Sequence, residues 1–265
     1  MTVEDYRAHS ALNFSRMKWL LKSPCHFIME GTADVEETLA MRMGSAVDEW
    51  ILSGKVRPHA IKPAELDGKP WQGNRTACKQ WVKDRKAEGF TVYSQDEYDT
   101  QMGMQKALEQ SPEFQKLLEV CPQRQLPVFA KYRGVELKVL MDMAGHDLGG
   151  YRCFGDLKCS VSAAPRDFAK KAATMHYDLQ QAVYAAVLGV SEALEDEPAM
   201  FWAVVESSPS APVSIFSVPR EAMDSGKRKL DRCIDLYLQC TESGNWPGYG
   251  QGIQQLSWPA WANNE

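Results

Sequence analysis

Three charged residues in the middle of the chain have the types and the spacing of a hydrolytic site. Asp142 is followed fourteen residues later by Asp156, and Lys158 comes two residues after that. Residues two apart on a strand lie on the same side, so Asp156 and Lys158 share a side if this segment is extended. The neighbouring arm of a hairpin can bring Asp142 beside them. Two carboxylates and one ammonium group would then converge.

The chemistry of such a cluster is metal-assisted hydrolysis. Two carboxylates at close range repel each other unless a divalent cation neutralises them, and oxygen ligands favour Mg²⁺ or Mn²⁺ over zinc. The ion polarises a phosphate and activates water, and the lysine stabilises the negative charge of the transition state. Taken alone, an Asp followed at this distance by Asp-x-Lys more commonly forms surface ion pairs. The surrounding sequence therefore decides between the two interpretations.

The elements that must position these residues follow from hydrophobic periodicity. Three short β-branched and aromatic segments predict an antiparallel meander over residues 128–132, 135–143 and 151–158, with Asp142 and Asp156 near strand ends. Two more strands are expected over residues 199–206 and 214–218. Helices are expected over residues 12–29, 40–52, 94–120, 165–188 and 222–241, with interruptions at Pro24 and Pro112. The order predicts an α/β or α+β core, a central mixed sheet flanked by helices, with a helical N-terminal section.

Two helical motifs accompany the charged cluster. Asp48 lies four residues after Gly44, so both lie on one face of the predicted helix, whereas Glu49 points about 100° away. Gln180 and Tyr184 form a QxxxY pattern, one turn apart, on the helix that follows Lys158. They could contact a phosphate or orient the lysine, and a buried hydrogen-bonded pair is the alternative.

The composition predicts an ordinary globular protein. The chain has 265 residues, of which 44% are hydrophobic and 25% charged, enough for one large domain or two small ones. No apolar stretch approaches the roughly 20 residues of a membrane helix, and no signal-peptide pattern opens the chain, so we expect a soluble, cytoplasmic protein without membrane contact. Seven cysteines without a CxxC pair argue against a disulfide framework and against an iron–sulfur nuclease.

The charge distribution suggests one nucleic-acid contact surface. The net charge of −5 gives no global positive field, but residues 66–90 hold six basic residues against three acidic ones and include two tryptophans. Aromatic rings with interleaved cations suit a strand with unpaired bases. The residues that we expect to contact DNA are Lys69, Trp71, Arg75, Lys79 and Lys83. A solvated, purely solubilising face is the alternative.

With these motifs in place, the chain resembles the PD-(D/E)xK nuclease superfamily, and within it the exodeoxyribonuclease VIII (RecE) family and its phage relatives. The segments that carry the resemblance are LNFSRMKWLLKSPCHF, AMRMGSAVDEWIL, VELKVLMDM, FGDLKCS and HYDLQQAVYAAVL. The resemblance implies a restriction-endonuclease-like core in a single nuclease domain over residues 1–265. Residues 1–125 would form a mainly helical section with the metal-ligand helix, and residues 126–265 the catalytic sheet with its flanking helices.

The resemblance also assigns roles to individual residues. It implies that two Mg²⁺ ions, for which Mn²⁺ can substitute, are held by Asp48, Asp142, Asp156 and the backbone carbonyl of Leu157. The catalytic residues would be Asp142, Asp156, Lys158, Gln180 and Tyr184. Members of the exodeoxyribonuclease VIII type usually carry His where Asp48 stands, whereas a lambda-like pattern carries an acid. Aspartate is a suitable ligand for Mg²⁺, but this difference leaves the number and preference of metals open.

The activity that the resemblance implies is a Mg²⁺-dependent exodeoxyribonuclease of phage or bacterial origin. It would digest linear double-stranded DNA from its ends, 5′ to 3′, and leave 3′ overhangs for a single-strand annealing protein in recombination. A ring-shaped homo-oligomer would be the functional form. Two alternatives stay open: a structure-specific endonuclease or nickase on the same core, because the motifs do not define end recognition, and a DNA-binding subunit with a weakened site, suggested by Asp48.

Overall fold

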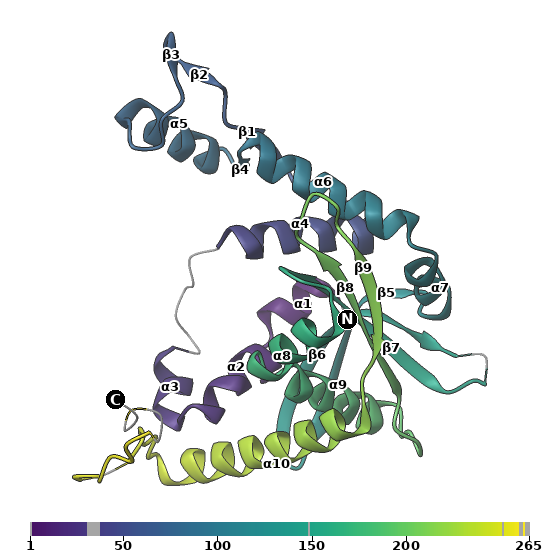
Figure 1. The fold of residues 1–265 in the computed structure, drawn as a ribbon. Helices are drawn as coiled ribbons and strands as arrows, with labels where there is room; N and C mark the ends of the chain where they lie inside the picture. Colours follow the sequence, from purple (N-terminus) through teal and green to yellow (C-terminus); the bar gives the residue numbers. More distant parts are fainter. Residues whose placement is uncertain (1, 31–37, 148, 251, 260–261, 263–265) are drawn as a thin grey trace.

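The computed structural model describes residues 2–30, 38–147, 149–250, 252–259 and 262, and its centre is a five-stranded sheet (Figure 1). The strands are β5 (Gln123–Tyr132), β6 (Val135–His146), β7 (Arg152–Ser160), β8 (Ala199–Glu206) and β9 (Val213–Ser217), in that spatial order. β7 and β8 are parallel, and the other neighbours are antiparallel. The predicted fold class, a mixed sheet flanked by helices, is confirmed, and so is the antiparallel meander from β5 to β7.

Helices cover both faces of the sheet (Figure 1). On one face, α9 (Tyr177–Ser191) packs against β5 and β6 and is itself covered by α10 (Arg220–Ser243). On the other face lie α4 (Leu39–Ser53), α6 (Gln95–Gln110) and α7 (Pro112–Val120). Each layer has its own apolar core: Leu179, Val183 and Val187 of α9 belong to the first, and Met43 and Val47 of α4 belong to the second. The sheet is therefore buried on both faces.

The N-terminal helical section precedes this sheet. It consists of α1 (Val3–Ala8), α2 (Phe14–Met17), a 3₁₀ turn (Lys18–Leu21) and α3 (Pro24–Met29). Ser23 caps α3 by accepting a hydrogen bond from the His26 N–H, and Pro24 occupies the first turn, where its missing N–H costs nothing. The interruption expected at Pro24 is therefore a helix start.

Two expected elements differ from the structure. The helix expected over residues 165–188 is two helices, α8 (Pro165–Thr174) and α9, because His176 adopts a left-handed conformation with φ of 57°. The strand expected to end near Asp142 continues to His146, because residues 143–146 still pair with β7. The helix over residues 94–120 is interrupted at Pro112, as expected, with Ser111 capping α7.

Residues 59–93 form an arm that projects beyond α4 and α6 (Figure 1). The arm consists of α5 (Thr76–Ala87) and four short strands: β1 (His59–Ile61), β2 (Glu65–Leu66), β3 (Lys69–Pro70) and β4 (Thr91–Tyr93). β1 pairs with β4 in parallel, and β2 with β3 as a hairpin. The basic segment of the sequence thus lies on the arm and not on the central sheet. In the described part of the chain, no helix is both long enough and apolar enough to cross a membrane.

Candidate active site

The sheet opens between β6 and β7, and the two central aspartates lie at this opening. The backbone pairing between these strands begins at the pair His146 and Arg152 and ends at the pair Met143 and Gly155. Asp142 and Asp156 are the residues directly beyond the last pair, one on each strand. The backbone N–H of Leu157 donates a hydrogen bond to Asp142 Oδ2 at 2.9 Å. The Asp142 carboxylate therefore takes the place of a backbone acceptor where the strands separate.

Strand β5 bends at the same level. Gln125 adopts a left-handed conformation with φ of 49°. It has no partner in the pairing of β5 with β6, because Arg124 pairs with Met143 and Leu126 pairs with Met141. Its side-chain Nε2 lies 3.5 Å from Asp142 Oδ1. Asp142 is thus contacted from both neighbouring strands, which fixes the direction of its side chain.

Lys158 lies on the same side of β7 as Asp156, as the alternation along a strand predicts. Its ammonium group forms an ion pair with Asp156 Oδ2 and lies 4.6 Å from the centroid of the Tyr177 ring. Leu157, between them, points into the core beneath α4. The aromatic ring and the carboxylate together hold the lysine at the opening.

The QxxxY pair is buried and acts on Asp156. Gln180 Nε2 donates a hydrogen bond to Asp156 Oδ1 at 2.9 Å and lies 3.2 Å from the hydroxyl of Tyr184. The Tyr184 hydroxyl donates to the Leu140 carbonyl at 3.1 Å. Gln180 and Tyr184 are only 7% and 9% exposed. The structure thus shows a buried hydrogen-bonded pair that orients the Asp156 carboxylate.

Asp48 reaches the site from α4. Gly44, one turn earlier, faces Cys159 of β7, and a Cβ at this position would make an ordinary van der Waals contact of 3.9 Å with Cys159 Cβ. Asp48 and Asp142 line one cavity of about 680 Å³, whose wall also includes Ser45, Glu49 and Arg57. Glu49 is held by Arg57 through contacts of 2.7 and 3.1 Å. Both acids of α4 line this cavity, but Glu49 is paired with Arg57, whereas Asp48 interacts electrostatically with Asp142.

The site holds more negative charge than its lysine can neutralise. Desolvation and the charge of Asp156 raise the pKa of Asp142 to about 7, although Lys158 opposes this shift. Desolvation and the charge of Asp142 raise the pKa of Asp48 well above its usual value. Desolvation lowers the pKa of Lys158, but Asp156, Tyr177 and Asp142 together outweigh this effect and raise the pKa overall. Three carboxylates thus share one ammonium group, which favours the binding of a further cation.

The donor set suits a hard divalent ion, although the side chains are engaged with one another. Asp48, Asp142 and Asp156 offer carboxylate oxygens, the ligands preferred by Mg²⁺ and Mn²⁺. Among the residues that the structure describes, no three His, Cys, Asp or Glu side chains are grouped so as to hold a metal ion. Asp156 is occupied by Lys158 and Gln180. Metal binding would therefore require these carboxylates to exchange hydrogen-bond and ion-pair partners for the ion.

The predicted DNA contacts lie on the arm, outside the cavity with Asp48 and Asp142. Arg75 donates hydrogen bonds to the carbonyls of Pro70 at 2.9 Å and Leu66 at 3.3 Å, and so braces the β2–β3 hairpin. Trp71 packs edge-on against Trp81, with ring centroids 5.5 Å apart. Lys69, Lys79 and Lys83 are exposed. The assignment of these five residues to DNA binding stays a prediction.

Two further residues contact the catalytic side chains: Tyr177 lies against Lys158, and Gln125 lies against Asp142. Tyr177 precedes Gln180 by three residues and lies on its helix face, so the helical spacing that links Gln180 and Tyr184 could have identified it. Gln125 had no such signal, because its position depends on the register between β5 and β6. The sequence-based analysis assigned neither residue.

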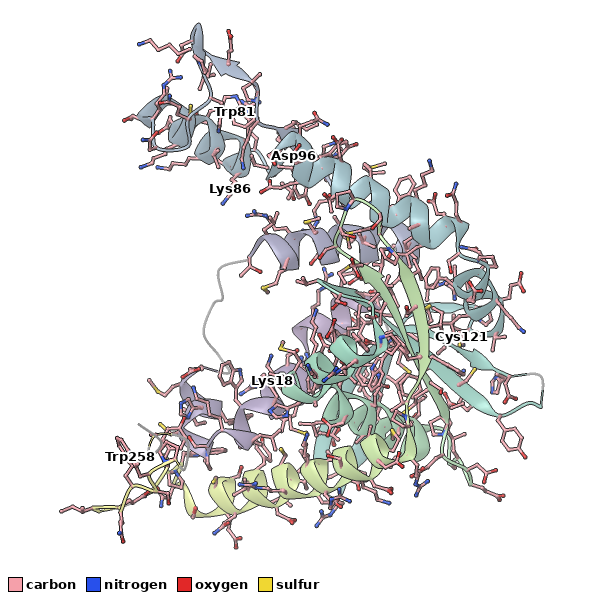
Figure 2. All side chains as sticks on the ribbon, in the orientation of Figure 1. Lys18, Trp81, Lys86, Asp96, Cys121 and Trp258 are labelled. Carbon is pink, nitrogen blue, oxygen red and sulfur yellow. The ribbon has the colours of Figure 1, made fainter. Side chains whose placement is uncertain are left out.

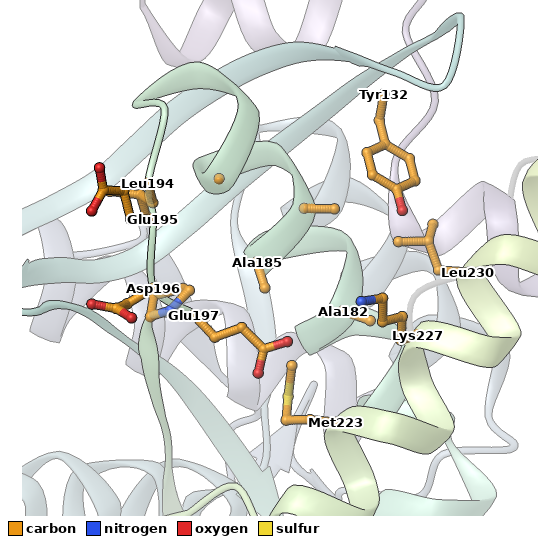
Figure 3. A pocket seen from close by; sticks show the side chains of 13 residues that line it. Tyr132, Ala182, Ala185, Leu194, Glu195, Asp196, Glu197, Met223, Lys227 and Leu230 are labelled. Atoms are coloured by element: carbon orange, nitrogen blue, oxygen red, sulfur yellow. The ribbon is translucent and has the colours of Figure 1, made fainter.

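A separate cavity of about 200 Å³ lies between α9, α10 and the segment before β8 (Figure 3). Its charged residues are Glu195, Asp196, Glu197 and Lys227. None of the predicted catalytic residues lines it, so it is distinct from the site at the opening of the sheet.

Comparisons with known proteins agree with this fold and motif set. A family model described as "PDDEXK-like domain of unknown function (DUF3799)" matches residues 13–257. A crystal structure of a proposed exonuclease from Eubacterium rectale has 16% identity and a TM-score of 0.63, covering 97% of this chain and 96% of that chain. That of a phage-related exonuclease from Haemophilus somnus 129PT has 11% identity and a TM-score of 0.36, covering 91% and 100%. No curated protein sequence matches.

The family match confirms the resemblance to the PD-(D/E)xK superfamily that the motifs predicted. It spans nearly the whole chain, including α4, the β6–β7 opening and α9. The fold is nuclease-like, and the solved structure with the higher TM-score supports the same architecture. The chain therefore belongs to the family of PDDEXK-like domains.

Proposed function

We propose that the protein is a metal-dependent DNA nuclease that hydrolyses phosphodiester bonds. The observation that carries this proposal is the convergence of Asp142, Asp156 and Lys158 at the opening between β6 and β7. Membership of a PDDEXK-like family supports it, and the resemblance of the sequence motifs assigns these three residues to the acid, acid and lysine positions. The adjoining cavity of about 680 Å³ gives the reacting phosphate access to Asp142 and Asp48.

Each residue has a definable task in this proposal. Asp142, Asp156, the Leu157 carbonyl and Asp48 would hold one or two Mg²⁺ ions. When bound, such an ion polarises the phosphate and lowers the pKa of water. Lys158 orients the attacking water and stabilises the charge of the transition state. Gln180 and Tyr184 are positioning residues, since Gln180 holds Asp156, Tyr184 supports Gln180, and both side chains are largely buried.

The proposal extends to an exonuclease that degrades linear duplex DNA 5′ to 3′ and leaves a 3′ overhang. The motif resemblance supports this, and the solved structure with a TM-score of 0.63 is described as a proposed exonuclease. An annealing protein as partner and a ring-shaped assembly belong to the same proposal and rest on the resemblance alone. An endonuclease or nickase is the second candidate, because no observed feature of the site selects a DNA end.

Digestion of DNA under defined metal conditions tests both levels of the proposal. End-labelled linear duplex and covalently closed plasmid are incubated with the protein in Mg²⁺, Mn²⁺ or EDTA. We expect loss of the linear substrate in either metal, no reaction in EDTA and an intact closed plasmid. Nicking or cutting of the closed plasmid would favour the endonuclease. No cleavage of any DNA in either metal would contradict a nuclease and leave a DNA-binding subunit.

A further inference from the structure

A third cavity, between the arm and α4, is lined by charged residues that are all basic. It has a volume of about 360 Å³ and lies between α5, β4 and the first half of α4. Its charged residues are Arg42, Lys62, Lys79 and Lys86, and its largest apolar residue is Trp71. No carboxylate belongs to the described wall of this cavity. In a chain with a net charge of −5, such a cavity selects anions.

The cations of this basic cavity have few partners within the protein. Lys62 lies 3.6 Å from Glu97, which also accepts a hydrogen bond from the Ser94 backbone. Arg42 Nε is buried and has no hydrogen-bond partner among the described residues. Lys79 and Lys86 are exposed, and within the described chain neither forms an ion pair. Gathering unneutralised cations is unfavourable, and a bound polyanion would offset this cost.

Trp71 adds an aromatic surface beside these cations. Its ring meets Trp81 at an angle of 83°, so Trp81 supports the ring without stacking parallel to it. Trp71 is half-buried and lines the cavity together with Lys79. A ring that can stack with an unpaired base, next to cations that bind phosphates, is the usual basis of single-strand binding without sequence preference. The cavity therefore suits a nucleic-acid strand better than an isolated anion.

The basic cavity and the catalytic cavity lie along one face of α4. Arg42, Ser45 and Glu49 follow one another at spacings of three and four residues, which places them on the same helix face. Ser45 and Glu49 line the catalytic cavity, and Arg42 lines the basic one. Arg42 precedes Asp48 by six residues, about 9 Å along the helix axis. On the arm, Lys86 extends from α5 on the side that faces α4 (Figure 2).

We propose that the basic cavity binds a single strand of DNA, with phosphates at Arg42, Lys79 and Lys86 and a base against Trp71. This proposal rests on the proposed nuclease function, and it specifies the path of the DNA strand next to the catalytic site. The assignment keeps Trp71 and Lys79 from the sequence-based set. It adds Arg42, Lys62 and Lys86. It leaves out Lys69 and Lys83, which do not line the cavity, and Arg75, whose guanidinium is engaged by backbone carbonyls.

A comparison of two matched double variants tests this proposal. Lys79→Gln with Lys86→Gln removes two charges inside the cavity, and Lys106→Gln with Lys116→Gln removes two charges from exposed positions on α6 and α7. Binding of fluorescein-labelled oligothymidylate is followed by anisotropy across a salt series, with Ca²⁺ in place of Mg²⁺. We expect the cavity pair to flatten the log–log salt dependence by about 1.4, since each phosphate contact on a single strand contributes about 0.7. The control pair should keep the slope of the unmodified protein.

A third variant separates stacking from charge. Trp71→Ala should weaken binding about tenfold without changing the salt slope, because base stacking releases no counterions. Circular dichroism verifies that the arm keeps its helix. Equal losses from the two lysine pairs would indicate diffuse attraction and overturn the proposal. An unchanged slope in the cavity pair, or a loss seen with duplex but not with the single strand, would overturn it as well.

The outcome is distinguishable from failure of the nuclease proposal. Strand binding is measured without turnover, so the anisotropy result does not depend on cleavage. If the unmodified protein binds the strand through the cavity but cleaves no DNA in Mg²⁺ or Mn²⁺, the nuclease proposal fails and the strand site stands. If the unmodified protein cleaves DNA and the cavity variant binds the strand normally, the nuclease proposal stands and the strand site fails.

Discussion

Gln180 donates a hydrogen bond to one oxygen of Asp156, and Lys158 pairs with the other. The two contacts come from different elements, α9 and β7, so the carboxylate is fixed from two directions. Tyr184 supports the arrangement from the next turn of α9, because its hydroxyl lies 3.2 Å from Gln180 Nε2 and donates to the Leu140 carbonyl. The QxxxY motif thus positions the acid of the Asp-x-Lys motif.

Replacing Gln180 should weaken metal use without removing a reacting group. Gln180→Leu leaves Asp156 Oδ1 without its donor, and loss of such a supporting contact typically costs 10- to 100-fold in metal affinity or activity. We expect the metal concentration for half-maximal cleavage to rise. Gln101→Leu on α6 is the control, since Gln101 is equally buried, with 7% exposure, but lies away from the site. Equal effects of both variants would show a general loss of packing.

Lys158→Ala should abolish cleavage while DNA binding stays measurable. The lysine is assigned to the water and the transition state, and removing one such charge-stabilising group usually costs at least about 10²-fold in rate. Single-turnover cleavage of labelled duplex measures this loss. Lys171→Ala is the control, because Lys171 donates a hydrogen bond to the carbonyl of neighbouring Cys159 at 3.0 Å. A loss well below 10²-fold for Lys158→Ala would contradict its role.

Asp48 and Glu49 are adjacent on α4 but should respond differently to neutralisation. Asp48→Asn removes a carboxylate at nearly constant shape, so activity should fall and require more metal. Glu49→Gln weakens only the contact with Arg57 and should leave the metal requirement unchanged. Asp48→His should move the preference from Mg²⁺ toward Mn²⁺, because imidazole is a softer ligand. Unchanged rates of Asp48→Asn at limiting metal would exclude Asp48 as a ligand.

The contact between α9 and α10 predicts a stability difference between two glycines. A Cβ on Gly226 of α10 would lie 2.1 Å from the carbonyl oxygen of Asp178, so Gly226→Ala must separate the helices. We expect it to lower the free energy of unfolding by about 1–3 kcal/mol, as overpacking does. Gly189→Ala on α9 meets no atom within 4 Å and should raise it by up to about 1 kcal/mol. Urea denaturation of both variants measures the difference, and equal stabilities would contradict the close packing.

The sequence was sufficient to predict the elements that carry the site. Short segments rich in β-branched and aromatic residues identified β6, β7 and β8, and the helical spacing of apolar residues identified α4 and α9. The pairing of Asp156 with Lys158 and the joint placement of Gln180 and Tyr184 follow from the same local periodicity.

Features set by long-range register were not predictable in this way. The separation of β6 from β7 after Met143 and Gly155 depends on how both strands pair with their other neighbours. The break at His176 comes from a backbone conformation that the periodicity of the flanking helices conceals. The role of Arg75 depends on a hairpin of two-residue strands, which the sequence does not mark.

Isothermal titration of the protein with Mn²⁺ tests the central claim most directly, because it measures the metal site without DNA or turnover. Asp142→Asn and Asp156→Asn are compared with the unmodified protein, with Asp147→Asn, in a surface turn, as the control. We predict clear Mn²⁺ binding by the unmodified protein and the control, and its loss in both site variants. Unchanged Mn²⁺ affinity in either site variant would remove that aspartate from the metal site and contradict the mechanism proposed for this opening in the sheet.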